Sequence, residues 1–469
     1  MTDANPGTGP AAAHETQALP VLPAAALAER VESLVAGGTR LLVGSVVDMA
    51  GVARAKGVPV DRSAAFHRTG VGASPTWNVF CIDNAVSVTE RLSVVGDLRL
   101  RADLDAARQL GDGITWAPAE MFDQQGRPWP GCARGRLRQA QAALAADGLD
   151  ALVGHELEFV LTSADGTPHP STRWQAYGLG ALLGDRTFVT ELEAELRAVG
   201  VPVEQLHAEY ADYQFEVSLA PRPPLEAADH VVLARLVICT VARRHGQLVS
   251  FSPLPLAGGA GNGAHQHLSL TRQGQPLLSG GTGPHGLTAD GAAAVAGIVT
   301  GLPETLAVFA GSVLSSLRLQ PGHWSGAFAC WGLENREAAV RLCAATPGNP
   351  QGANVELKCI DPSSNPYLTS AALLGLAHHG IREQLALPAE VTVDPAGLDP
   401  DSARSARAVR LADNQTEALD LLAASPLADA LVGPDILDAL LAVRRHEART
   451  YAGHSADDLT DRFRFAWSS

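Results

Sequence analysis

The chain lacks the features that mark secreted, zinc-binding or membrane-spanning proteins. Its six cysteines form no C-x-x-C pair and no zinc-finger spacing, so we interpret them as reduced packing residues. No uninterrupted run of about 18 or more apolar residues predicts a membrane span. Residues 1–20 contain neither a basic start nor an apolar stretch. We therefore expect no signal peptide there, but a disordered tail.

An excess of positive charge is also missing. Lys and Arg number 35 against 50 Asp and Glu, which gives a formal net charge of −15. This balance argues against a protein whose affinity depends on neutralising nucleic-acid phosphates. We expect a cytoplasmic protein with no nucleic-acid partner and no membrane partner.

The common nucleotide-binding loops are absent as well. No G-x-x-x-x-G-K-[ST] motif occurs, and GGAGNGAHQH at residues 258–267 does not fit G-x-G-x-x-G. That stretch leads into a predicted strand and not into a helix, which excludes a Rossmann interpretation. Any phosphate chemistry must use other residues.

What is present is a long, apolar-rich chain with two predicted domains. Hydrophobic residues make up 46% of the chain, enough for a sizeable core. Residues 22–37 predict a helix, and LLVGSVVDMAGVARAKGVPV, at 41–60, predicts two strands joined by a turn. We assign residues 21–115 to a small α+β domain and 116–469 to a large domain. The large domain begins with a connector rich in Pro, Gly and Gln at 116–130.

Four predicted strands of the large domain share one pattern, with apolar side chains on one face and carboxylates or imidazoles on the other. In GHELEFVL, Glu156 and Glu158 share a face because alternate residues of a strand point the same way. The polar-face residues of QFEVSLAP, GAHQHLSL and NVELKCIDP are Gln214, Glu216, Ser218, His265, His267, Ser269, Glu356 and Lys358. A solvated sheet edge would explain one such strand. Four of them predict an open barrel or curved sheet with a polar interior.

Electrostatics indicates what this interior holds. Two carboxylates about 6 Å apart repel by roughly 3 kcal/mol at an effective dielectric constant near 20. Several converging glutamates therefore require neutralising cations or raised pKa values. Oxygen ligands with one or two imidazoles favour Mg²⁺ or Mn²⁺ over zinc.

Arginines follow this acidic set along the chain. Arg318 lies in SSLRLQPG, and Arg336 and Arg341 lie in ENREAAVRL. Each alone could be a surface or ion-pair residue. Beside a site with several metals they become candidates for clamping a transferred phosphoryl group.

Taken in order, GHELEF, EYADYQFE, GAHQHLSL, SLRLQPG, ENREAAVR and VELKCIDPSSNPYL resemble the glutamine synthetase family. The resemblance spans about residues 41–380. It implies an α+β fold with a small N-terminal β-grasp domain and a large C-terminal glutamine-synthetase-type catalytic domain containing a curved antiparallel sheet. It also implies active sites between subunits of a double-ring dodecamer. The family reaction uses ATP and Mg²⁺ or Mn²⁺, with two or three ions per site.

The resemblance further implies roles for individual residues. The first metal would be held by Glu158, Glu209 and Glu216, and the second by Glu156, His265 and Glu356. The nucleotide side would contain Glu204, His267, Ser269 and Arg341, and phosphate would be handled by Arg336 and Arg341. The acid substrate, glutamate, would be bound by Arg318, Gly261 and Lys358. Its γ-carboxylate would become a γ-glutamyl phosphate, which a nitrogen nucleophile then attacks.

Where the family binds ammonium, the sequence departs from the pattern. The family's aspartate in a D-G-S-S motif is replaced at about Ser74, and PGHWSGA places His323 and Trp324 where a loop glutamate should be. An aromatic residue there suits an amine larger than ammonia. VARAKGV and WGLENRE also resemble the branch that γ-glutamylates polyamines or ethanolamine. Lys358 replaces an arginine on the acid side, which loses the bidentate fork, and Asn354 replaces a basic residue near the nucleotide.

Several alternatives stay open at this stage. The chain could be an ordinary glutamine synthetase with a rearranged ammonia site, or a non-catalytic structural or regulatory family member. His323 could be the general base for the amine or an exposed loop residue, and Trp324 could be a wall of the amine pocket. The two amine-site segments contain no acidic cluster, which favours a small or apolar amine.

Overall fold

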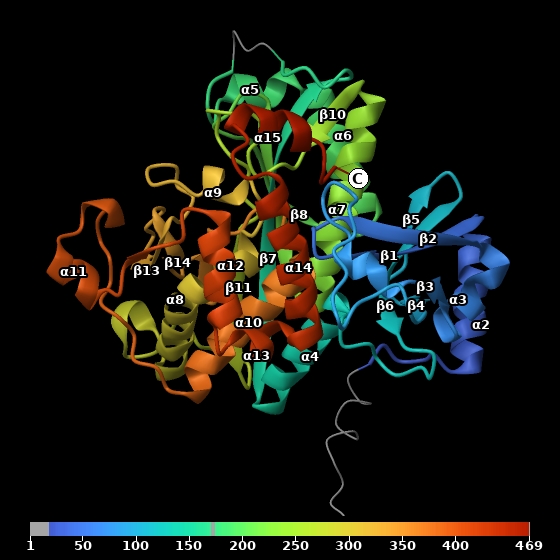
Figure 1. The fold of residues 1–469 in the computed structure, drawn as a ribbon, viewed down its shortest axis with the longest axis horizontal. Coiled ribbons are helices and arrows are strands. Elements are labelled where there is room, and N and C mark those ends of the chain that lie inside the picture. The colour runs from blue at the N-terminus through green and yellow to red at the C-terminus, as the bar shows by residue number, and fades with distance from the viewer. Residues whose placement is uncertain (1–17, 170–173, 469) are drawn as a thin grey trace, which may run out of the picture.

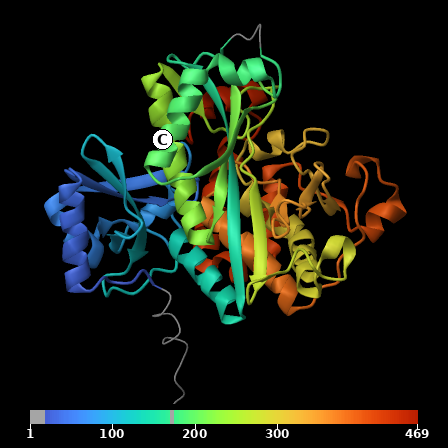
Figure 2. The same ribbon diagram turned by 180° about the vertical axis from the view of Figure 1, so that it is seen from behind.

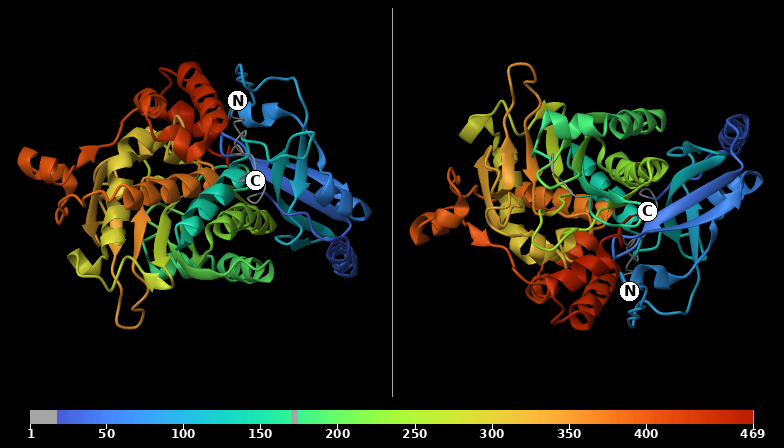
Figure 3. Two further views of the ribbon diagram at one scale, coloured as in Figure 1. Left: turned by 90° about the horizontal axis from the view of Figure 1, so that it is seen from below. Right: turned by 90° about the horizontal axis from the view of Figure 1, so that it is seen from above.

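The structure, a computed structural model, describes residues 18–169 and 174–468. A small N-terminal part lies beside a larger C-terminal part, and the segment containing α11 (Pro400–Ser405) lies at the far end from the N-terminal part (Figure 1). The views from below and above show the same side-by-side arrangement (Figure 3). Most of the predicted tail lies outside the described residues. Leu19, at its described end, is already packed, with 3% of its surface exposed.

The N-terminal part is a mixed sheet with helices on one side. Its elements are α2 (Ala24–Ala36), β1 (Leu41–Val47), β2 (Ala53–Pro59), α3 (Ser63–Arg68), β3 (Val71–Ala73), β4 (Leu98–Ala102), β5 (Arg108–Gly111) and β6 (Ile114–Phe122). The strand order is β2-β1-β6-β4-β3, with β5 also paired to β6. Leu42 and Val46, on one face of β1, belong to the same core cluster as Leu27 and Leu34 of α2. The predicted helix and the first two strands are therefore confirmed.

The predicted connector at 116–130 is wrong in its first half. Strand β6 occupies Ile114–Phe122 and lies between β1 and β4 in the first sheet, so residues 115 and 116 both belong to this strand. The misleading residue is Pro118, which suggested a break. It is tolerated because the β1–β6 ladder ends at the Ser45–Pro118 pair.

The larger part is built on a second sheet, which is antiparallel except for the β13–β14 pair. Its strands are β7 (Leu149–Ser163), β8 (Val203–Ala208), β9 (Gln214–Arg222), β10 (Gln247–Ser250), β11 (Gln266–Arg272), β12 (Gln275–Pro276), β13 (Phe328–Leu333), β14 (Ala338–Cys343), β15 (Asn354–Leu357) and β16 (Val409–Arg410). The order is β16-β13-β14-β15-β11-β7-β9-β8, with β10 on β7 and β12 on β11. The four strands predicted to be polar on one face are thus the consecutive neighbours β15, β11, β7 and β9.

Helices α4 (Ala133–Ala146), α7 (Pro224–Arg244) and α10 (Pro366–Arg382) pack on the apolar face of this sheet. The other helices of the larger part are α5 (Leu179–Gly184), α6 (Arg186–Ala198), α8 (Ala289–Phe309), α9 (Ser315–Arg318), α12 (Gln415–Ala424), α13 (Ala428–Val432), α14 (Pro434–Thr450) and α15 (Ala456–Phe463). Leu157 and Phe159 of β7 belong to one core cluster with side chains of α4, α7 and α10. Figure 2 shows β7 and β11 from the side opposite to α10 and α14.

One of these helices is long and apolar enough to be compared with a membrane span. By length and composition, Ala289–Phe309 could cross a membrane, and 78% of its most apolar window is buried inside the structure. Asp290, Pro303 and Glu304 interrupt its apolar run, so it contains no uninterrupted run of the kind sought in the sequence. Such burial is typical of the central helix of a folded core.

Buried polar contacts fix the two parts together. Asn365 donates to the carbonyl of Val47 at 2.9 Å, and Trp467 donates through Nε1 to the carbonyl of Ala50 at 2.8 Å. Arg134 of α4 binds Glu120 of β6 at 2.7 Å and also Asp229 of α7 at 2.8 Å, with all three side chains buried.

Candidate active site

A cleft of about 990 Å³ opens on the polar face of the second sheet. The predicted site residues that line it are Glu156, Glu158, Glu209, Glu216, Gly261, His265, His267, Arg318, His323, Trp324, Arg336, Arg341, Glu356 and Lys358. The exceptions are Ser74, Glu204 and Ser269. The sheet therefore gathers nearly all of the residues that the sequence singled out.

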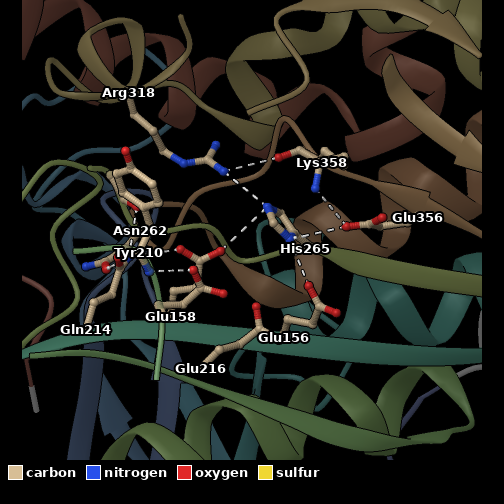
Figure 4. A network of polar contacts seen from close by, with 12 residues as sticks. Glu156, Glu158, Tyr210, Gln214, Glu216, Asn262, His265, Arg318, Glu356 and Lys358 are labelled. Carbon is tan, nitrogen blue, oxygen red and sulfur yellow. Dashed lines mark hydrogen bonds and ion pairs between the residues drawn. The ribbon is translucent and has the colours of Figure 1, made fainter. Parts of the chain in front are cut away.

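His265 lies at the centre of the cleft floor. Its Nδ1 is 2.8 Å from Glu156 Oε2 and 3.3 Å from Glu356 Oε1, and its Nε2 is 3.8 Å from Glu158 Oε1. Figure 4 shows the glutamates of β7 and β9 pointing toward this ring, with Arg318 entering from the other side. Burial alone would raise the pKa of Glu156. Hydrogen bonds from His265 and His267 outweigh this effect and hold the pKa of Glu156 well below its usual value.

A second acidic group lies toward β8 and β9. Burial, together with the nearby Glu158 and Glu216 carboxylates, raises the pKa of Glu209 to about 7. Burial and Glu156 likewise raise the pKa of Glu216. His207 lies between the two, with Nδ1 3.5 Å from Glu209 and Nε2 3.1 Å from Glu216. The hydrogen bond to Glu216 raises the pKa of His207 to about 9.

Glu356, by contrast, is surrounded by cations. Lys358 Nζ and Arg341 Nη1 each lie 3.1 Å from its carboxylate. Burial alone would raise the pKa of Glu356, but the charges of Lys358 and His265 outweigh burial and lower it to about 2. Lys358, predicted to hold the acid substrate, thus directs its charge to Glu356.

The donor set on this floor fits divalent cations. Ligand atoms lying within 4.8 Å of one another form the groups Glu156–Glu216–His265, Glu156–His267–Glu356 and His207–Glu209–Glu216. A raised pKa marks a carboxylate whose burial and repulsion by neighbouring carboxylates are not fully offset by nearby positive charge. A bound cation would supply that positive charge. Oxygen-rich sets with imidazole suit Mg²⁺ or Mn²⁺. The groups include His207 and His267, which the sequence had not placed among the metal ligands.

The predicted acid-substrate side contains an unpaired cation. Arg318 Nη2 lies 3.2 Å from His265 Nε2 and donates to the carbonyl of Lys358 at 3.3 Å, while its buried Nη1 has no partner among the described residues. A Cβ on Gly261 would lie 2.5 Å from Arg318 Cγ and 2.7 Å from the Pro253 carbonyl, so only glycine leaves room for this arginine. A carboxylate is the natural partner for the free Nη1.

The predicted phosphate side is less enclosed. Arg336 is exposed and Arg341 half-buried, and in the part of the chain that the structure describes the buried Nε of Arg341 has no partner. His267 Nδ1 donates to Asn354 Oδ1 at 2.8 Å, so the asparagine that replaces a basic residue orients this imidazole.

The cleft does not include three of the predicted residues. Ser74 caps the short 3₁₀ helix Pro75–Val79 in the N-terminal part, and its Oγ accepts from the Thr76 hydroxyl at 2.7 Å. Glu204 is exposed on β8 and alternates with Gln205, which lines the cleft. Ser269 donates to the Ala353 carbonyl at 3.3 Å. Strand alternation therefore places Glu204 on the face of β8 opposite to Gln205 and His207.

Some cleft residues were not predicted. Gln205 and His207 continue the alternating polar face that ends in Glu209, so extending that pattern upstream would have found them. Tyr177 and Tyr210 also line the cleft. Both tyrosines come from irregular segments, where no periodic pattern marks them.

Comparison with known proteins identifies relatives over most of the chain. Residues 130–462 match the family described as glutamine synthetase, catalytic domain. The chain is 39% identical over 438 residues to the γ-glutamylpolyamine synthetase GlnA3 of Streptomyces coelicolor, covering 92% of this chain and 94% of that one. It is also 29% identical over 364 residues to the glutamine synthetase of Clostridium saccharobutylicum, covering 76% and 80%.

Solved structures show the same similarity. A crystal structure described as a novel glutamine synthase homologue superposes with a TM-score of 0.80 at 31% identity, covering 91% of this chain and 98% of that chain. A GmaS–ADP complex gives a TM-score of 0.80 at 26% identity, covering 92% and 98%. The shared arrangement thus includes both parts of the chain.

Proposed function

The chain belongs to the glutamine synthetase family and is an ATP-dependent ligase, and on that premise we propose that it joins the γ-carboxylate of glutamate to an amine larger than ammonia. One observation carries the proposal. The residues predicted to bind metal all line the cleft, whereas its mouth presents His323 and Trp324 where the family's ammonia loop has a glutamate. The similarity to a γ-glutamylpolyamine synthetase also supports an amine larger than ammonia as the acceptor.

The chain's own residues suit each part of this reaction. Arg318, through its free Nη1, would bind a carboxylate of glutamate, and Gly261 leaves the room that this arginine occupies. Divalent ions held by the groups around Glu156, Glu216 and Glu356 would neutralise phosphate charge and polarise its oxygens.

The chemistry itself has two balanced parts. The γ-carboxylate of glutamate takes the terminal phosphoryl group of ATP, and ADP is released. The amine nitrogen then attacks the acyl carbon, phosphate leaves, and the nitrogen loses a proton. The arginines at positions 336 and 341 would compensate the charge on the transferred group.

The test is phosphate release from ATP with Mg²⁺ and glutamate, measured with ammonia, ethanolamine, putrescine, spermidine and simple monoamines. Release with one or more amines in clear preference to ammonia is the expected result. Equal or better release with ammonia would make the chain an ordinary glutamine synthetase. Absence of release with every acceptor, in protein that binds ATP, would favour a non-catalytic role.

The proposal extends to assembly and location. We propose a double-ring dodecamer, which is supported by the family's sites between subunits and by the position of Ser74 outside the cleft of its own chain. A cytoplasmic location is part of the same proposal. Light scattering coupled to size-exclusion chromatography would test the assembly, and a stable, active monomer would contradict it.

A further inference from the structure

The mouth of the cleft contains two exposed aromatic rings. Tyr210 and Trp324 both line the cleft, with 64% and 47% of their surfaces exposed. Their ring centroids are 6.4 Å apart and the planes meet at 76°. Two large rings held nearly at right angles beside a charged cleft form two walls of an open box.

Trp324 is held by an unexpected residue. Its backbone is left-handed, with φ of 52°, a conformation that residues other than glycine rarely adopt. The carboxylate of Glu337 accepts hydrogen bonds from the backbone N–H groups of Trp324 at 3.0 Å and of Gly322 at 3.3 Å. Glu337 therefore fixes the loop in the one conformation that presents the indole to the cleft.

Tyr210, on the adjoining wall, is positioned through its backbone. Its backbone N–H donates to Glu209 Oε2 at 2.9 Å, so this residue lies directly beside the acidic group. Figure 4 shows Tyr210 together with that network.

The chemistry of the box selects for positive charge. The faces of Trp and Tyr attract ammonium groups, and aromatic boxes bind alkylated amines in this way. Glu337, which lies behind the Trp324 backbone, adds a negative charge at the mouth. The sequence showed no acidic cluster in the two amine-site segments, because Glu337 belongs to the following motif.

We propose that Tyr210 and Trp324 bind the charged distal nitrogen of a diamine or polyamine, with Glu337 as the positioning residue that fixes Trp324. This inference rests on the proposed function and deepens it. Among amines larger than ammonia it selects those with a second positive charge. Ethanolamine and apolar monoamines have no such group to place in the box.

The first test compares putrescine with n-butylamine, which has the same number of carbons and a single charge. Trp324→Leu keeps an apolar side chain and removes the aromatic face, so KM for putrescine should rise roughly 3- to 30-fold while KM for butylamine changes little. Tyr210→Leu should act in the same direction. Trp324→Phe should keep KM for putrescine within about threefold of the wild type. An equal change for both amines, or no change in Trp324→Leu, would overturn the proposal.

Glu337 needs a readout that general damage would not produce. Glu337→Ala should raise KM for putrescine and leave kcat for butylamine near that of the wild type. Glu337→Gln keeps one accepting oxygen and should recover part of the putrescine affinity. If Glu337→Ala lowers kcat equally for both amines, Glu337 has only a structural role, and its assignment as the positioning residue for Trp324 is wrong.

The outcomes separate this inference from the proposed function. Turnover of butylamine equal to or better than that of putrescine would leave the amine ligase standing and reject the aromatic box. Turnover with ammonia alone would reject the proposed function. In that case calorimetric titration of spermidine into the wild type and Trp324→Leu decides on the box: weaker binding by the variant supports it, and equal binding rejects it.

Discussion

The floor and the mouth of the cleft are built on different physical principles. On the floor, charged side chains from paired strands are buried and fix one another through short contacts, as His265 does with Glu156 and Glu356. At the mouth, exposed side chains from irregular segments are positioned through their backbones, as Glu337 does with Trp324. The floor is suited to a reaction whose catalytic groups must stay in place. The mouth is suited to recognition of the amine, because its residues can change without displacing the groups of the floor.

The sharpest way to break this comparison is to remove a floor carboxylate. Glu356→Gln leaves Lys358 and Arg341 without their shared counter-charge and removes a candidate metal ligand. We expect kcat/KM to fall roughly a hundred- to a thousandfold for every amine. Steady-state phosphate release measures it.

The matched control is Glu193→Gln on α6, where the side chain is 39% exposed and pairs with Arg197. It should behave like the wild type. Full activity of Glu356→Gln would show that the floor is not the reaction centre.

A change of one methyl group tests how closely the floor is packed. A Cβ on Gly263 would lie 2.5 Å from His265 Nε2 and 2.6 Å from Glu158 Oε1. Gly263→Ala should lower kcat about ten- to a hundredfold for all amines, because reacting groups are displaced by a fraction of an ångström or more. Gly180→Ala, where the added Cβ meets nothing within 4 Å, is the control. Equal activity of both variants would mean that the floor is more adaptable than its contacts indicate.

The raised pKa of Glu209 makes metal binding depend on pH. The pKa of Glu209 is about 7 in the folded protein, against an ordinary value of 4.5. Between pH 4.5 and 7 the metal-free folded state therefore keeps a proton on Glu209 that the unfolded state has already lost. Stability of the metal-free protein should therefore decrease as pH rises through this window, and Mn²⁺ binding near pH 6.5 should release up to about one proton. Calorimetry in buffers of different ionisation enthalpy measures the release. Glu209→Gln should lose it, and an unchanged release would contradict the assignment.

The smallest expected effect concerns His323, an exposed residue of the mouth. If the mouth acts in recognition, His323→Gln should change the amine KM a few-fold and leave kcat within about threefold across the pH range. A general base typically contributes about a hundredfold or more. A loss of that size in kcat, with a change in the acidic limb of the pH profile, would identify His323 as a general base. The mouth would then take part in the reaction and not only in recognition.

The same division separates what the sequence could predict from what it could not. Strand alternation placed Glu156 and Glu158 on one face, and the structure confirms that the four polar strands are neighbours. The mouth has no periodic pattern, so Tyr210 was missed, and the two-atom anchoring of a loop by Glu337 has no signature in a single sequence. The start of the predicted connector at 116–130 was misplaced because Pro118 lies inside β6.

The order of the strands also has a consequence for folding. Glu156, His265 and Glu356 are brought together by the β7–β11 and β11–β15 pairings, which join segments about a hundred residues apart in the chain. Closing such loops costs entropy before any contact repays it, so these pairings should form slowly. As they form, strands carrying like charges must approach one another. Divalent cations present during synthesis would reduce that repulsion, so the ions that serve the reaction would also help the nascent chain to reach its native topology.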